Sequence, residues 1–204
     1  MKNWMKNFYI ILILFFSFTI YSCAKKSDSS STTATNTEIE GTWQTPCHAW
    51  GSYYRLNKLT VSSTNWTDTT EYHTDSSCAT DYTKWSTTFG SLSIGNELTF
   101  PSYGSSGGSG HDFTLTLSEY TYTAQNSSLV SSNNTNSYCG ITDWVLNTAH
   151  DVAGKTCGSS TLQSIGTAYY GIYILDGSKL FWTLSSDAYN DSVPTGDNDT
   201  FTKQ

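Results

Sequence analysis

From residue 53 onward, the chain is built of short runs in which aromatic or aliphatic side chains alternate with serine and threonine. This alternation is typical of β-strands that bury one face and leave the other in water. Stretches rich in Ala or Leu are nearly absent, whereas Ser and Thr make up 63 of the 204 residues. The sequence therefore predicts an all-β protein with about 8–10 short antiparallel strands, in a barrel or a sandwich. We expect an up-and-down β-barrel, because closure removes exposed sheet edges.

Three local patterns refine this prediction. Trp66, Thr70 and Tyr72 are spaced so that they share one face of a strand. Residues 95–96 (Gly-Asn) are a candidate two-residue turn between two apolar segments. The alternation slips by one residue at 118–119, which predicts a β-bulge at that point.

The strongest hairpin signal is Asp-Gly at residues 176–177, between two apolar strands. A two-residue turn at 176–177 would place Tyr173 opposite Leu180 and Gly171 opposite Trp182. In that register, the Trp182 ring would cover the gap that Gly171 leaves in its strand.

The first residues predict export. Two lysines precede an apolar segment of about 13 residues, shorter than the roughly 20 that span a membrane. We therefore expect a signal peptide at 1–22, a flexible Ser/Thr-rich tether at 23–38 and a folded domain at 39–204. Ile20, Ser22 and Cys23 resemble the lipobox of bacterial lipoproteins. That resemblance implies a lipid (palmitate) on Cys23 and a lipid-anchored location in the cell envelope, which we expect to be the outer membrane, with its periplasmic or surface face left open.

Four cysteines follow Cys23, and an even number in an exported protein predicts disulfides. Three pairings are possible, and we favour the two that each bracket one compact segment, Cys47–Cys78 and Cys139–Cys157. Residues 142–152 fit either a short helix or a strand. We expect an irregular segment there, held by the second disulfide.

Several functions are disfavoured. The net charge of −7 and the scarcity of Lys and Arg argue against nucleic-acid binding. The cysteines and histidines lack the spacing of a metal site, so we expect no metal and no cofactor. A Gly-x-Ser-x-Gly motif at 104–108 lacks the helix that a catalytic serine elbow needs, and we expect no catalysis. The aspartates within 187–199 lack a calcium-loop pattern.

Gly41-Thr42-Trp43, just before the first strand, resembles the Gly-x-Trp signature of lipocalins. More broadly, the chain resembles exported bacterial lipoproteins with a lipocalin-like domain, through GTWQTPC at 41, YCGITDW at 138 and YGIYILDGSKLFW at 170. In lipocalins, the tryptophan plugs one end of an eight-stranded barrel under an arginine from a late strand. The sole arginine here is Arg55, which lies in the first strand region, so Lys179 or Lys203 is left to provide the cation over the tryptophan.

The resemblance implies a barrel that either encloses one small hydrophobic ligand or is filled by its own side chains. The aromatic residues that we expect to line it are Trp43, Trp66, Trp85, Tyr173 and Trp182. Two functions stay open. The first is binding of a small hydrophobic ligand in the envelope, and the second is a non-enzymatic, adhesin-like surface or structural module that contacts an extracellular partner.

Overall fold

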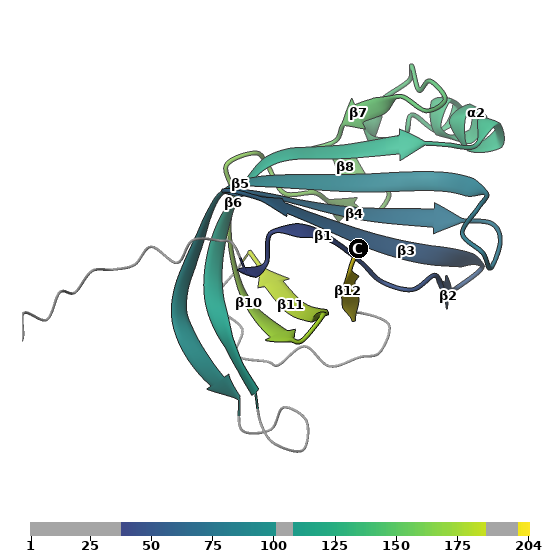
Figure 1. Cartoon of the computed structure of the whole chain (residues 1–204). Coiled ribbons are helices and arrows are strands. Elements are labelled where there is room, and N and C mark those ends of the chain that lie inside the picture. The colour runs from purple at the N-terminus through teal and green to yellow at the C-terminus, as the bar shows by residue number, and fades with distance from the viewer. Residues whose placement is uncertain (1–37, 101–107, 187–199) are drawn as a thin grey trace, which may run out of the picture. The chain divides into compact units, whose positions relative to one another are not determined.

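One antiparallel sheet dominates the computed structural model, which describes residues 38–100, 108–186 and 200–204 (Figure 1). The predicted signal peptide, Cys23 and nearly all of the predicted tether lie outside these residues. So do most of the Gly-x-Ser-x-Gly motif and the aspartates within 187–199. In the described part of the chain, no helix is long and apolar enough to cross a membrane.

The strands are β1 (Gly41–Gln44), β2 (His48–Trp50), β3 (Tyr53–Ser62), β4 (Asn65–His73), β5 (Asp81–Phe100), β6 (Gly108–Ala124), β7 (Ala149–Asp151), β8 (Thr156–Cys157), β9 (Ser160–Thr161), β10 (Ala168–Asp176), β11 (Lys179–Ser185) and β12 (Phe201–Lys203). Within the described ranges, ten of them form one sheet in the order β1-β12-β11-β10-β6-β5-β4-β3-β2, with β7 beside β6. Since β1 also pairs with β3, eight of these strands form a closed ring. The all-β, antiparallel prediction is confirmed.

The two longest strands, β5 and β6, connect the two parts of the sheet. They curve from the part that contains β3 and β4 to the part that contains β10 and β11 (Figure 1). Their pairing shifts so that Thr88 faces Glu119 and Phe89 faces Leu117, which leaves Ser118 as an extra residue. The predicted bulge at 118–119 is therefore confirmed.

The predicted turn at 95–96 is wrong, because both residues lie inside β5 at the third shift in its pairing with β6. A Cβ atom at Gly95 would collide with the carboxyl group of Asp112. The glycine thus permits a close approach between strands rather than a reversal of the chain.

The β10–β11 hairpin exists, but its register differs from the prediction by two residues. The turn residues are Gly177 and Ser178, and Asp176 pairs with Lys179. Gly177 has a φ of 60°, which a hairpin turn with glycine at its first central position requires. A one-position move of a two-residue turn shifts every cross-strand pair by two, so each side chain keeps its face.

This register changes the neighbours of Gly171. It faces Leu184 on β11 and Phe113 on β6, while Tyr173 faces Trp182. A Cβ atom at Gly171 would collide with the Phe113 ring and with the carbonyl oxygen of Thr183. Phe113, rather than Trp182, therefore covers this glycine.

The larger of the hydrophobic cores, which we call the ring core, contains buried residues from all eight strands of the ring. Trp43 on β1 is 1% exposed, and its indole nitrogen donates a hydrogen bond to the carbonyl oxygen of Ile39 at 2.8 Å. The Lys203 ammonium on β12 lies 5.2 Å from the centre of the Trp43 ring, within cation–π range. Of the two lysines considered for this place, Lys203 is the one above Trp43.

Residues 125–167 form an excursion that rejoins the sheet at β7 and builds a second, smaller core against β6. Helix α2 (Ser127–Thr135), the 3-10 helix η2 (Tyr138–Gly140) and the β8–β9 pair belong to this excursion. The second core contains Tyr122, Ala124, Cys139, Trp144, Val152 and Cys157. Residues 142–152 are irregular apart from β7, as expected.

Helix α2 was not predicted, because its sequence SSLVSSNNT has no apolar periodicity. It begins where the Asn126 side chain accepts hydrogen bonds from the backbone N–H groups of Ser128 and Leu129. Both predicted disulfides, Cys47–Cys78 and Cys139–Cys157, are confirmed.

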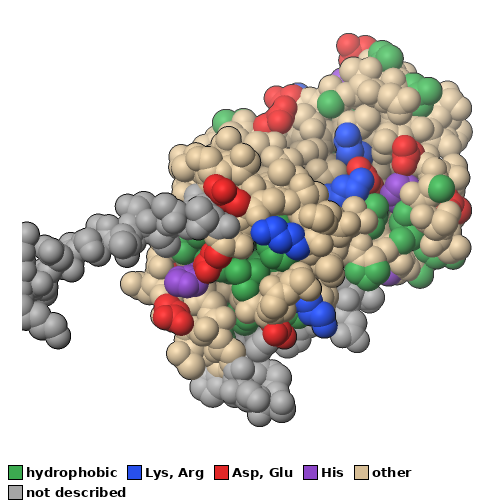
Figure 2. Space-filling view, in the orientation of Figure 1, with side chains coloured by type: hydrophobic (Ala, Val, Ile, Leu, Met, Phe, Trp, Pro, Cys, Tyr) green, Lys and Arg blue, Asp and Glu red, His purple; other side chains and the backbone are tan. Residues whose placement is uncertain are grey.

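The exterior matches the composition. On the face shown in Figure 2, uncharged polar side chains and backbone cover most of the surface, and the charged side chains are scattered. A polar exterior and a buried aromatic interior are the two faces that the alternating runs require.

Candidate functional site

One face of β4 passes from the core into a pocket. Trp66 is fully buried in the ring core, and Asp68, Thr70 and Tyr72 follow at two-residue intervals on the same face. These three residues line a pocket of about 390 Å³. The predicted common face of Trp66, Thr70 and Tyr72 agrees with this arrangement.

The neighbouring strands continue the pocket wall. Thr87 and Trp85 on β5 pair with Asp68 and Thr70, and Tyr120 on β6 pairs with Thr87. All three line the pocket beside the β4 residues. The sheet therefore supplies a floor of aromatic rings, hydroxyl groups and one carboxyl group.

The excursion supplies the opposite wall, through Tyr138, Cys157, Ser160 and Leu162. The Cys139–Cys157 disulfide ties η2 to β8 at this wall. The backbone N–H of Leu162 also donates to the carbonyl oxygen of Lys155 at 2.9 Å. The wall is thus held by covalent and backbone contacts of its own.

The aromatic rings of the pocket support one another at steep angles. The Trp85 and Tyr120 ring centres are 5.9 Å apart with planes at 65°, so the two rings form adjacent walls. Tyr122 lies behind Trp85 at 4.6 Å and reaches Tyr138 at 5.5 Å. Burial raises the pKa of the Tyr120 and Tyr138 hydroxyls, so both stay neutral at physiological pH.

Asp68 is the one charged side chain among the described residues that line the pocket. Burial raises the pKa of its carboxyl from 3.8 to about 7, against the opposing effects of the Arg55 charge and the Thr69 backbone N–H. The Arg55 guanidinium lies 3.8 Å from the centre of the Trp50 ring, and its Nε donates to His48 at 3.2 Å. Asp68 therefore lies at the border of core and pocket, where ionisation is costly.

The strand beside β4 carries a buried amide. Asn57 pairs with Thr70 across β3 and β4 and is 8% exposed. Its Oδ1 has no hydrogen-bond partner among the described residues. This oxygen is a buried acceptor on the face of the sheet that Thr70 shares, and Asn57 is not among the residues that line the pocket.

The sequence-predicted ligand residues divide between the core and the pocket. Trp43, Trp66 and Tyr173 are at most 1% exposed, and Trp182 packs against the same core. Trp66 meets Trp182 edge to face, with ring centres 5.3 Å apart. Of the five predicted residues, Trp85 alone lines the pocket.

Sequence reasoning missed Asp68, Tyr120 and Tyr138. A usable signal existed for Asp68, which has the same spacing as Trp66, Thr70 and Tyr72 and is the single acid on their face. No such signal existed for Tyr138, which reaches the pocket only through the fold of the excursion.

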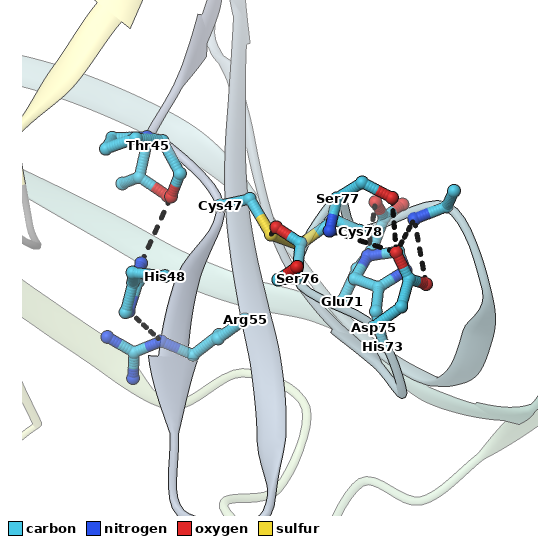
Figure 3. The surroundings of a disulfide bond; sticks show 12 residues. Thr45, Cys47, His48, Arg55, Glu71, His73, Asp75, Ser76, Ser77 and Cys78 are labelled. Atoms are coloured by element: carbon cyan, nitrogen blue, oxygen red, sulfur yellow. Dashed lines mark hydrogen bonds and ion pairs between the residues drawn. A yellow bond between two sulfur atoms is a disulfide. The ribbon is translucent and has the colours of Figure 1, made fainter.

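A second cluster of polar side chains surrounds the Cys47–Cys78 disulfide (Figure 3). The Asp75 carboxylate accepts hydrogen bonds from the Ser77 side chain and from the backbone N–H groups of Ser77, Ala79 and Thr80, which hold its pKa well below its usual range. His73 is buried 3.2 Å from an Asp81 oxygen. Asp75 thus shapes the loop beside the disulfide. Nowhere in the described ranges do three or more His, Cys, Asp or Glu side chains form a group that could hold a metal ion.

A scan against protein-family models found no match to this chain, and a search of curated protein sequences found none either. The fold and the site therefore define the class of protein by themselves. It is an all-β protein with a closed ring of strands and, beside the ring core, a pocket of aromatic and hydroxyl side chains with one carboxyl group.

Proposed function

We propose that this protein is an exported, lipid-anchored binding protein that holds a small molecule between β4–β6 and the excursion. The observation that carries the proposal is the pocket of about 390 Å³ under a disulfide-held wall. Its volume lies within the roughly 300–1,000 Å³ of typical small-molecule sites. Hydroxyl and carboxyl groups share the lining with aromatic rings, so the ligand is amphipathic rather than wholly hydrophobic.

Export is supported by the two disulfides, because such bonds persist in oxidising compartments. A lipid on Cys23 would place the domain at a membrane of the cell envelope, on a tether of about 16 residues. The test is labelling with a palmitate analogue. Wild type should incorporate the label and Cys23→Ser should not, and equal labelling of the two would remove the anchor from the proposal.

A lipocalin-like barrel is the architecture we propose for the ring. It is supported by eight antiparallel strands in closed pairing and by the placement of Trp43 under the Lys203 ammonium. The ligand, however, lies beside the ring core rather than within it, because Trp43, Trp66 and Trp182 pack against their neighbours there.

The second candidate function is contact with an extracellular partner. It is favoured by the filled ring core and by Val145 and Leu146, consecutive side chains that are 56% and 44% exposed. Two adjacent apolar side chains are a small area compared with the patches that mark interfaces. The pocket therefore favours the small-molecule function.

The binding function is tested on the full chain, purified in a maltoside detergent. Fragments are screened by the shift of the Trp85 indole resonance, which is assigned by its loss in Trp85→Phe. We expect amphipathic aromatic or aliphatic fragments to move this resonance. Tyr138→Ala should weaken the binding of these fragments, whereas Tyr170→Ala, on the exposed side of β10, should leave it unchanged. If no fragment moves it, and native mass spectrometry finds no co-purified molecule, the binding function is wrong.

A further inference from the structure

The pocket combines several aromatic rings with a single, half-buried carboxyl group. Resting on the binding function proposed above, we infer that its ligand carries an organic ammonium group, seated among Tyr72, Trp85, Tyr120 and Tyr138 and facing Asp68. Quaternary ammonium ions, in which the charge is spread over methyl groups, are the members of this class that suit such walls best.

The aromatic walls provide the first part of the argument. Ring faces carry negative potential and attract cations within about 6 Å of their centres. Trp85 and Tyr120 meet at 65° and so present walls in two directions. Tyr72 comes from β4 on the sheet side, and Tyr138 from the excursion on the other. A methylated cation between them would contact rings from more than one side.

The charge distribution provides the second part. Within the described lining no Lys, Arg or His is present, and Arg55, whose charge acts on Asp68, lies outside that lining. Asp68 offers a counter-charge on the sheet side of the pocket. A bound cation would compensate the cost of ionising Asp68 at the edge of the core. The net charge of −7 adds a long-range attraction for cations.

Other ligand classes fit these features less well. An anion would face Asp68 directly. A neutral sugar or polyol could bond to Thr70, Thr87 and Ser160, but it would place no charge opposite Asp68 beyond that of Arg55. An ammonium ion is the class that uses both the aromatic walls and the carboxyl group.

The test compares choline with 3,3-dimethyl-1-butanol, which has the same shape without the charge. Binding to the full chain, in a maltoside detergent that carries no ammonium group, is followed by calorimetry and by the Trp85 indole resonance. We expect choline to bind at least about tenfold more tightly than the alcohol. Asp68→Asn should remove about tenfold of that affinity, whereas Asp176→Asn, which deletes the same charge at the exposed end of β10, should leave it unchanged.

A pH series on the wild type keeps the test independent of any variant. Choline stays charged at every pH, so the change in affinity belongs to the protein. The groups that face Asp68 are Arg55, Tyr72, Tyr120 and Tyr138, and the hydroxyls of the last two stay neutral. Affinity should therefore rise about tenfold between about pH 6 and pH 8 as Asp68 ionises.

The outcomes separate this inference from the binding function. If the neutral alcohol or other neutral fragments move the Trp85 resonance as strongly as choline does, the inference is wrong and the binding function stands. If choline binds but neither Asp68→Asn nor pH changes its affinity, the inference is also wrong. If neither choline nor any neutral fragment moves the resonance, both proposals are wrong.

Discussion

The carboxyl group of Asp68 makes the protein less stable as the pH rises, and Asp68→Asn should remove this effect. The pKa of the carboxyl is about 7 in the folded state, against an ordinary value of 3.8 that we take for the unfolded chain. Between these two values, the folded state binds more protons than the unfolded state. The free energy of unfolding therefore falls as the pH rises from about 4 to about 7.

The magnitude follows from the size of the shift. Each unit of pKa difference corresponds to about 1.4 kcal/mol, so about three units give an effect on the order of 4 kcal/mol at pH 8. Asparagine has the shape of the protonated carboxyl and cannot ionise. Asp68→Asn should therefore match the wild type below about pH 4 and exceed its free energy of unfolding by up to about 4 kcal/mol near pH 8.

The assay is urea unfolding with both disulfides intact, at about pH 4, 6 and 8, for the wild type, Asp68→Asn and the exposed Asp176→Asn control. The difference in the free energy of unfolding between wild type and Asp68→Asn should grow with rising pH, and the control should have the same pH dependence as the wild type. A difference that is constant with pH would refute the raised pKa of the Asp68 carboxyl, and so would a wild type whose free energy of unfolding rises relative to that of the variant as the pH increases.

Three further changes test the fold around the pocket. Gly171→Ala should lower the free energy of unfolding by about 1–3 kcal/mol, because its Cβ would collide with Phe113; a change near zero in urea unfolding would show that this approach is looser. Asn126→Ala should cost about 1 kcal/mol through the lost cap of α2, and a circular dichroism melt identical to that of the wild type would contradict this. Replacing both Cys139 and Cys157 with Ser should cost about 3 kcal/mol and abolish binding in the Trp85 assay; retained binding would show that the pocket wall does not depend on the disulfide.

Local patterns predicted the strands well and their exact pairing less well. The Asp176-Gly177 signal predicted the hairpin, yet a two-residue turn can begin at either of these residues. In the structure, Gly177 is the first of the two central turn residues. Gly95 carried the same ambiguity, since glycine permits both a turn and a close approach, and only the position of Asp112 on the neighbouring strand decides between them.

The candidate site was harder to predict for a different reason. Alternation shows which side chains share a face of the sheet, but it does not show how far along that face other parts of the chain pack against it. Trp66 and Asp68 share a face and lie two residues apart, yet the first belongs to the core and the second to the pocket. The difference comes from residues 138–162, whose position depends on the Cys139–Cys157 disulfide and on contacts distant in sequence.

The bulge at Ser118 explains how one strand serves both the core and the pocket. Phe113, Leu115 and Leu117 face the ring core, and Tyr120 lines the pocket on the same side of the sheet, although it comes three positions after Leu117. In an unbroken strand, an odd separation would turn Tyr120 to the opposite face. The extra residue restores the face, and its hydroxyl donates a hydrogen bond to the carbonyl oxygen of Thr88 at 2.9 Å. The slip in alternation that the sequence displays is therefore the feature that keeps the core and the aromatic wall of the pocket on one continuous surface.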